Sequence, residues 1–264
     1  MFAFQMTPVV RVLLFLNIGL YAAEQLVGIP LSRYFTLYHV NHPEFQPFQV
    51  VTYCFMHDQQ DWTHLLSNMI GLFFFGPFIE RQITSKRFLQ LYLFCGIAVG
   101  LLGVGIQYLE IKKFEQETVY TMENPTPENV IKFVEPFPIT PEFRSLLSAY
   151  QKEPTNPHYI QNVKEGIRQI AKLGILGPGL VGASGAIFGL FMVMFLLFPN
   201  LELRLLFPPI PIKAKYLVGA LGLYELYRLM QNAPGDNVSH FSHLAGMLFA
   251  FIMIKLVWKM SRVY

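Results

Sequence analysis

The chain has little charge for its length. Only 14% of its 264 residues are charged, whereas charged residues make up about 25% of an average soluble protein. Hydrophobic residues make up 53%, which is more than a single core of this size usually buries. The composition therefore excludes an ordinary water-soluble globular domain and indicates that a lipid bilayer surrounds most of the chain.

The chain also lacks clusters of basic residues and has few cysteines. The net charge is only +3 and no run rich in Lys and Arg occurs, so we expect no nucleic-acid partner. The two cysteines, Cys54 and Cys95, are too few for a disulfide framework and lack the spacing of a zinc site. We interpret both as packing residues.

Long apolar runs are what the chain does contain. A helix needs about 20 apolar residues to cross a hydrocarbon layer of about 30 Å. The first run is too long for a signal peptide and is interpreted as a retained anchor helix. The sequence predicts an all-α membrane protein, a bundle of six transmembrane helices within residues 9–27, 62–79, 88–109, 173–198, 214–230 and 241–258.

The basic residues of the short loops predict the orientation of this bundle, because Lys and Arg favour the cytoplasmic side. Arg33 is the only Lys or Arg in the short connections 28–61 and 231–240. We therefore expect a multi-pass protein of the cell membrane with both termini in the cytoplasm. The basic residues on the cytoplasmic side would be Arg81, Lys86, Arg87, Arg204, Lys213, Lys215, Lys259 and Arg262.

A polar segment at about residues 110–172 separates the third and fourth runs. We predict a single membrane domain of residues 1–264 with this segment as an extracytoplasmic insert. Five prolines predict an irregular first half, and helices are predicted at 142–152 and 159–172. The second helix carries an apolar stripe, which would lie on the membrane or cap the bundle; its members are Ile160, Val163, Ile167 and Ile170.

The fourth run contains several glycines in its outer half, so regular helix is predicted only from about Ala183 to Phe198. Such a helix is about 24 Å long and begins below the membrane surface, where its free backbone groups require a water-filled cavity. Ser184 lies at this start, within Gly182-Ala183-Ser184-Gly185. It is interpreted either as a nucleophile at the positive end of the helix or as an N-cap among packing glycines.

His243 lies near the start of the sixth run. Gly246 and Ala250 leave a smooth helix face, which favours close approach to the glycine-rich fourth run. That contact would bring His243 to Ser184 as its general base. The alternative is a packing histidine without a catalytic role.

His64 and Asn68 are four residues apart, on one face of the second helix. Both side chains can donate hydrogen bonds, as an oxyanion hole requires. They would serve equally as hydrogen-bond partners between helices.

Other polar residues are interpreted structurally. Glu225 lies inside the fifth run, so we expect it to face the bundle interior beside a hydrogen-bond partner. His240 is interpreted as a structural or rim residue. His57 is expected to fix its loop through a hydrogen bond, and Glu80 to fix a loop at the end of the second helix.

Together, three motifs resemble the rhomboid family of intramembrane serine proteases: His64 with Asn68, Gly182-Ala183-Ser184-Gly185, and His243-Leu244-Ala245-Gly246. The resemblance implies a Ser–His dyad without an acidic third member. Ser184 would be the nucleophile and His243 the base, while His64, Asn68 and the Ser184 N–H would hold the oxyanion.

The resemblance also implies transmembrane protein substrates, cut within or beside a membrane span, and no metal or cofactor. Phe188 stands where some members have Tyr, and its ring is expected to pack on His243. One alternative is an inactive rhomboid-like protein that binds transmembrane segments. Another is a transporter with a site at the membrane midplane, formed by Glu225, His240 and the interrupted fourth helix.

Overall fold

The computed structural model describes residues 5–175, 179–204, 211–231 and 239–262. Parts of the predicted fourth run (176–178) and of the loop before the sixth run (232–238) lie outside the described residues. The helices are α1 (Pro8–Val27), α2 (Leu31–Phe35), α3 (Gln49–Thr52), η1 (Tyr53–Phe55), α4 (Trp62–Ile83), α5 (Ser85–Glu123), α6 (Pro127–Val134), α7 (Pro141–Lys152), α8 (Pro157–Ile175), α9 (Ser184–Leu197), α10 (Ala214–Gln231), α11 (His240–Phe251) and its π-helical continuation η2 (Ile252–Val257).

A short antiparallel hairpin, which the sequence did not predict, precedes α10. Its strands are β1 (Glu202–Arg204) and β2 (Pro211–Lys213), with Glu202 opposite Lys213. The described chain is otherwise mostly helical, as expected.

Helices long and apolar enough to cross a membrane support a multi-pass membrane protein. They are α1, α4, α5 and the continuous helix His240–Val257. The apolar α9 has 14 residues, which corresponds to about 21 Å, and is shorter than a full span, as predicted. The total of six spans is not confirmed by these helices and remains a prediction.

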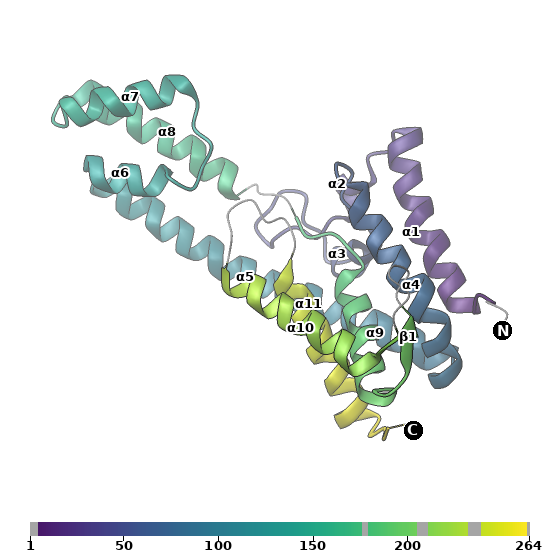
Figure 1. The fold of residues 1–264 in the computed structure, drawn as a ribbon. Coiled ribbons are helices and arrows are strands. Elements are labelled where there is room, and N and C mark those ends of the chain that lie inside the picture. The colour runs from purple at the N-terminus through teal and green to yellow at the C-terminus, as the bar shows by residue number, and fades with distance from the viewer. Residues whose placement is uncertain (1–4, 176–178, 205–210, 232–238, 263–264) are drawn as a thin grey trace. The chain divides into compact units, whose positions relative to one another are not determined.

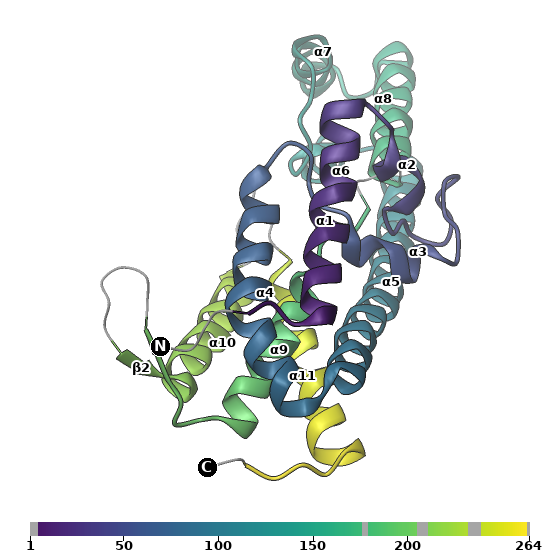
Figure 2. The same ribbon diagram turned by 90° about the vertical axis from the view of Figure 1, so that its right-hand side faces the viewer.

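The first of two compact units comprises Met1–Tyr38, Glu44–Gly103 and Leu180–Tyr264. Helix α9 is apolar on all sides and has no charged residue, and a helix of this kind is stable only when it is surrounded. It packs against α4, α10 and α11 at the centre of the unit (Figures 1 and 2). Its inward side chains form much of the core: Ile187, Leu190, Val193, Met194 and Leu197.

Glu80 near the end of α4 fixes the start of α1. Its buried carboxylate accepts hydrogen bonds from the backbone N–H groups of Val9 (3.2 Å) and Val10 (3.0 Å). It also accepts one from the Ser85 hydroxyl at 2.6 Å. The first N–H groups of a helix have no partner within it, so the carboxylate supplies one. The predicted structural role of Glu80 is confirmed. Glu80 fixes the start of a helix, however, where the sequence predicted that it fixes a loop.

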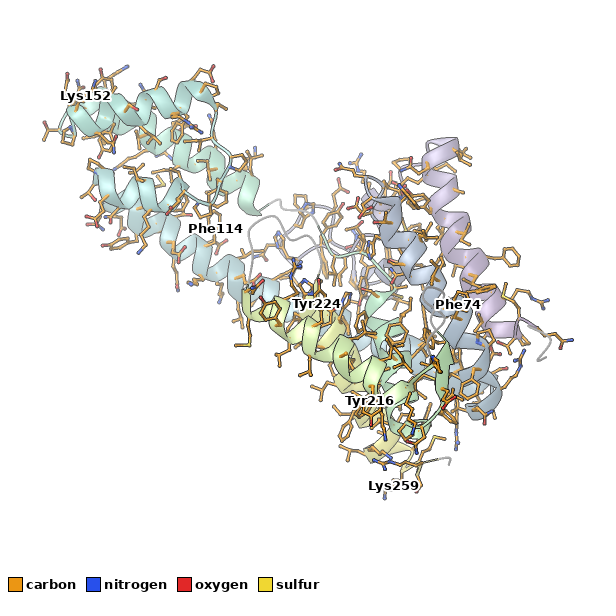
Figure 3. All side chains as sticks on the ribbon, in the orientation of Figure 1. Phe74, Phe114, Lys152, Tyr216, Tyr224 and Lys259 are labelled. Atoms are coloured by element: carbon orange, nitrogen blue, oxygen red, sulfur yellow. The ribbon has the colours of Figure 1, made fainter. Side chains whose placement is uncertain are left out.

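The second compact unit comprises His39–Pro43 and Val104–Gly179. The end of α5 packs with α6, α7 and α8 around a separate core, in which the Phe114 ring stacks on Phe133 with centroids 5.6 Å apart. Phe114 is labelled in Figure 3. The helices predicted at 142–152 and 159–172 are confirmed as α7 and α8. Val163 and Ile167 of the apolar stripe are fully buried in this core, so the stripe faces protein and not lipid.

The prediction of an irregular first half of the insert was wrong. Helix α5 continues to Glu123, and α6 follows after a short turn. Pro127 and Pro141 occupy the first turns of α6 and α7, where a missing N–H costs nothing. Thr126 and Thr140 cap the same helices through their hydroxyls. These prolines therefore start helices.

Candidate active site

Helices α9 and α11 are in backbone contact at Gly185 and Gly246. A Cβ on Gly246 would overlap the carbonyl group of Gly185, and one on Gly189 would lie 3.3 Å from the Gly246 carbonyl oxygen. Ala250 is also fully buried. The close approach predicted from Gly246 and Ala250 is confirmed, and it brings the first turns of the two helices together.

Ser184 is the first residue of α9. Ala183 occupies the N-cap position and no side chain caps the helix, so the interpretation of Ser184 as an N-cap was wrong. The side chain is partly exposed. Its hydroxyl lies at the end of α9 where backbone N–H groups lack helical partners and the helix dipole is positive.

The backbone before Ser184 is held on both sides. Leu180 and Leu37 exchange two backbone hydrogen bonds of 2.8 and 3.0 Å. The Gly182 N–H donates to the Tyr53 carbonyl oxygen at 3.1 Å. These bonds fix the path along which the chain enters α9, and therefore the position of Ser184.

His243 lies in the first turn of α11 and is 8% exposed. Its ring stacks on Phe188, one turn after Ser184, with centroids 4.0 Å apart and planes 6° apart. The expected packing of Phe188 on His243 is confirmed. The structure forms no hydrogen bond between Ser184 and His243, although it describes both residues.

His64 reaches the same place from the first turn of α4. A Cβ on Gly182 would lie 2.8 Å from the Cε1 and Nε2 atoms of His64 and 3.8 Å from the Ser184 hydroxyl oxygen. Gly182 also has a φ of +121°, so only glycine fits there. The His64 imidazole also lies near the imidazole of His243. The structure thus brings Ser184, His64 and His243 together.

Asn68 is buried on α4, one turn after His64. Its Nδ2 group has no hydrogen-bond partner in the part of the chain that the structure describes. An interhelical bond from this amide, one of the two interpretations, is therefore absent among those residues. A buried donor without an acceptor is costly, so this amide is unlike an ordinary packing group.

The backbone of His57 forms a hydrogen bond within its loop, where its carbonyl oxygen accepts from the Gln59 side-chain amide at 3.1 Å. The ring takes no part, because neither of its buried nitrogens has a partner within the described ranges. Its ring instead contacts His64 edge-to-face, with centroids 5.2 Å apart. Burial, and secondarily the nearby His64, lower the pKa of His57 to about 3. The ring that packs against His64 is therefore a neutral imidazole.

Two positioning features were missed in the sequence. Asp61 caps α4 by accepting a 3.0 Å hydrogen bond from the Thr63 N–H, which fixes the turn that carries His64. An Asp directly before an apolar run is a recognisable start signal. The second feature is the close contact between the His64 ring and Gly182. It joins segments that are far apart in the sequence, so no local pattern indicates it.

Glu225 of α10 lies between two histidines of α11. One carboxylate oxygen, Oε2, is 2.5 Å from Nδ1 of His240 and 2.9 Å from Nδ1 of His243. All three residues are buried, so His240 is not a rim residue. The prediction that Glu225 faces the interior beside a hydrogen-bond partner is confirmed.

The same three side chains form a donor set that zinc uses, two imidazoles and a carboxylate. Ligand atoms about 2.0–2.1 Å from a tetrahedral zinc ion lie about 3.3 Å apart. The 2.5 Å contact between Glu225 and His240 is much shorter. The geometry is that of a hydrogen bond and does not fit a metal between these atoms.

Taken together, the apolar helices and the buried polar cluster define a multi-pass helical membrane protein with a polar site inside its helix bundle. The Rhomboid domain family model matches residues 44–110 and 164–260. The chain therefore belongs to the rhomboid family. The unmatched residues between these two ranges fall within the second compact unit.

A curated relative supports the same family. The chain is 22% identical over 264 residues to Rhomboid-like protein 11, chloroplastic, of Arabidopsis thaliana. The similarity covers 95% of this chain and 64% of the relative, so the chain spans less than two thirds of the relative's length. No solved structure matches the chain.

Proposed function

We propose that the protein is an intramembrane serine endopeptidase that hydrolyses membrane-anchored proteins within or beside a transmembrane segment. The observation that carries this proposal is the backbone contact between Gly185 and Gly246. Through it, the helix that begins with Ser184 and the helix that bears His243 share one site, which His64 also borders.

In this mechanism, His243 accepts the Ser184 proton as the hydroxyl oxygen attacks the substrate carbonyl carbon. His243 then donates that proton to the leaving amine, which releases one product and leaves an acyl group on Ser184. Water, deprotonated by His243, hydrolyses the ester in the second half of the reaction. No metal or cofactor takes part.

The negative charge on the carbonyl oxygen would be held by donors from two helices. His64 and Asn68 of α4 supply side-chain N–H groups, and the Ser184 N–H supplies one from the first turn of α9. The unpartnered Nδ2 of Asn68 supports this assignment. The positive end of the α9 dipole acts in the same direction.

The membrane setting follows from the distribution of basic residues. We infer six spans in the cell membrane with both termini in the cytoplasm, and an extracytoplasmic position for the insert at about 110–172. The first turns of α4, α9 and α11 then lie at the outer end of the bundle. Substrate spans would reach the site from the bilayer near its outer face.

Labelling with a fluorophosphonate probe tests the proposal. Purified parental protein and Ser184→Ala are treated with the probe, and both are incubated with a membrane-anchored model substrate. The proposal requires labelling and cleavage by the parental protein, and neither by Ser184→Ala. If the parental protein remains unlabelled where an active serine protease is labelled, the chain is an inactive rhomboid-like protein that binds transmembrane segments.

A further inference from the structure

A buried carboxylate lies directly behind the histidine proposed as general base. Glu225 is 5% exposed, and its Oε2 atom is 2.9 Å from Nδ1 of His243. An ionisable side chain inside a membrane span is costly to bury and indicates a function. We propose that Glu225 is a positioning residue that orients His243 and stabilises its protonated form. This inference rests on the proposed function and adds an acidic third member to the Ser–His dyad.

The contact involves the ring nitrogen that a catalytic triad requires. If Nδ1 of His243 carries its proton toward Glu225, the lone pair of the neutral ring lies on Nε2. Nε2 is then the atom that accepts the Ser184 proton. Stacking on Phe188 fixes the plane of the same ring. A hydrogen bond from Nδ1 to Glu225 would therefore fix the tautomer of His243 and the rotation within the ring plane that stacking leaves open.

His240 holds the carboxylate in place. Its Nδ1 group is hydrogen-bonded to the same oxygen of Glu225 at 2.5 Å. Its ring also meets the Tyr224 ring edge-on, with centroids 6.4 Å apart, and Tyr224 is labelled on α10 in Figure 3. His240 and Tyr224 thus anchor Glu225 at the junction of α10 and α11.

The two contacts of the carboxylate differ in alignment. The His240 bond has hydrogen-bond geometry, whereas Nδ1 of His243 has the distance but not the angle. Catalytic hydrogen bonds often align only when substrate is bound. His240 therefore retains Glu225, and on this proposal His243 forms its hydrogen bond with the carboxylate when its ring turns toward Ser184.

Steady-state cleavage by the full-length chain tests this inference. Glu225→Gln keeps the size and shape of the side chain and removes its charge. Loss of a charge-assisted hydrogen bond is expected to lower kcat about 10- to 100-fold. KM should stay within about twofold, because Glu225 does not contact substrate.

Glu225→Asp separates charge from shape. It restores the carboxylate on a shorter side chain, so we expect its kcat to lie between those of the parental protein and Glu225→Gln. A purely structural role gives the opposite order, because Gln preserves the packing better than Asp. Parental kcat in Glu225→Gln, or a lower kcat in Glu225→Asp than in Glu225→Gln, overturns the proposal.

Folding is controlled with a second buried carboxylate. Glu80→Gln removes the charge that caps α1, far from the chemistry, and is expected to lower the unfolding temperature and leave kcat unchanged. If Glu225→Gln does not fold, the kcat of Glu225→Asp alone tests the positioning role. Its kcat must then fall several-fold at constant KM, and an unchanged kcat overturns the inference.

Two further outcomes separate this inference from its alternatives. If the parental protein itself neither labels nor cleaves, the proposed function fails before Glu225 is tested. If a chelator abolishes parental cleavage and zinc restores it, Glu225, His240 and His243 form a metal site and the positioning role is overturned. Cleavage that is insensitive to the chelator supports the positioning role.

Discussion

The carbonyl group of Gly185 occupies the space that a side chain on Gly246 would need. This one contact sets the distance between α9 and α11, and with it the distance between the helix starts that carry Ser184 and His243. Small residues allow this approach in membranes, where helices associate through close packing. The geometry of the proposed dyad therefore depends on the absence of a single methyl group.

Gly246→Ala should separate the two helices and misplace His243. A displacement of about 1 Å in a catalytic site can lower the rate about 10²-fold, and we expect a loss of this size in cleavage of a model substrate. Gly19→Ala is the matched control, because a Cβ there meets nothing within 4 Å. Equal rates for Gly246→Ala and Gly19→Ala would show that helix contact does not set the site geometry.

The proposed oxyanion donors should contribute less than the dyad. His64→Ala and Asn68→Ala each remove one donor, which typically costs about 10²–10³ in kcat. Ser184→Ala and His243→Ala should abolish cleavage and leave the helical content unchanged. The measurement is kcat on an anchored substrate, with circular dichroism for the fold. Parental cleavage rates in both dyad variants would rule out the mechanism.

The ends of several helices were readable from the sequence. The first and fifth apolar runs agree closely with α1 and α10, because the first ends at a glycine and the fifth where polar residues begin. Helix α9 begins at Ser184, one residue from the expected start, since glycines before it prevent regular helix. Local composition thus determines where these helices begin and end.

Contacts between helices could not be read in the same way. The sequence indicated that Glu225 needs a partner, but not that His240 and His243 share its carboxylate. Likewise, nothing local shows that His57 meets the His64 ring. Such pairs depend on how separate elements pack, which residue periodicity does not encode. The prediction for the insert was wrong for a different reason. A proline can either break a helix or start one, and Pro127 and Pro141 start helices.

The buried His57 should make stability depend on pH. In the folded protein its pKa is lowered from the ordinary 6.5 to about 3. As the pH falls, His57 is therefore protonated at a higher pH in the unfolded chain than in the folded protein. The stability that a neutral His57 allows is complete above pH 6.5 and is lost progressively from there toward pH 3. His57→Phe keeps a ring in place and removes the titration.

Thermal unfolding in detergent at pH 7.5 and pH 5 measures this effect. The drop in unfolding temperature between the two pH values should be smaller in His57→Phe than in the parental protein. His158→Phe, at an exposed position of α8, controls for loss of a histidine and should leave the drop unchanged. A drop of the same size in all three proteins would contradict the role of His57.

Glu80→Ala should destabilise the bundle without changing its chemistry. The substitution leaves the N–H groups of Val9 and Val10 and the Ser85 hydroxyl without their acceptor. Loss of a helix cap costs about 0.5–2 kcal/mol, and loss of the partly buried Ser85 hydrogen bond adds to it, so the unfolding temperature should fall measurably. Glu117→Ala, which removes an exposed carboxylate of α5, should not lower it. Because Glu80 lies at the opposite end of α4 from His64, the rate of Ser184 labelling below the unfolding temperature should equal that of the parental protein. A slower rate at that temperature would mean that the cap of α1 also positions the site.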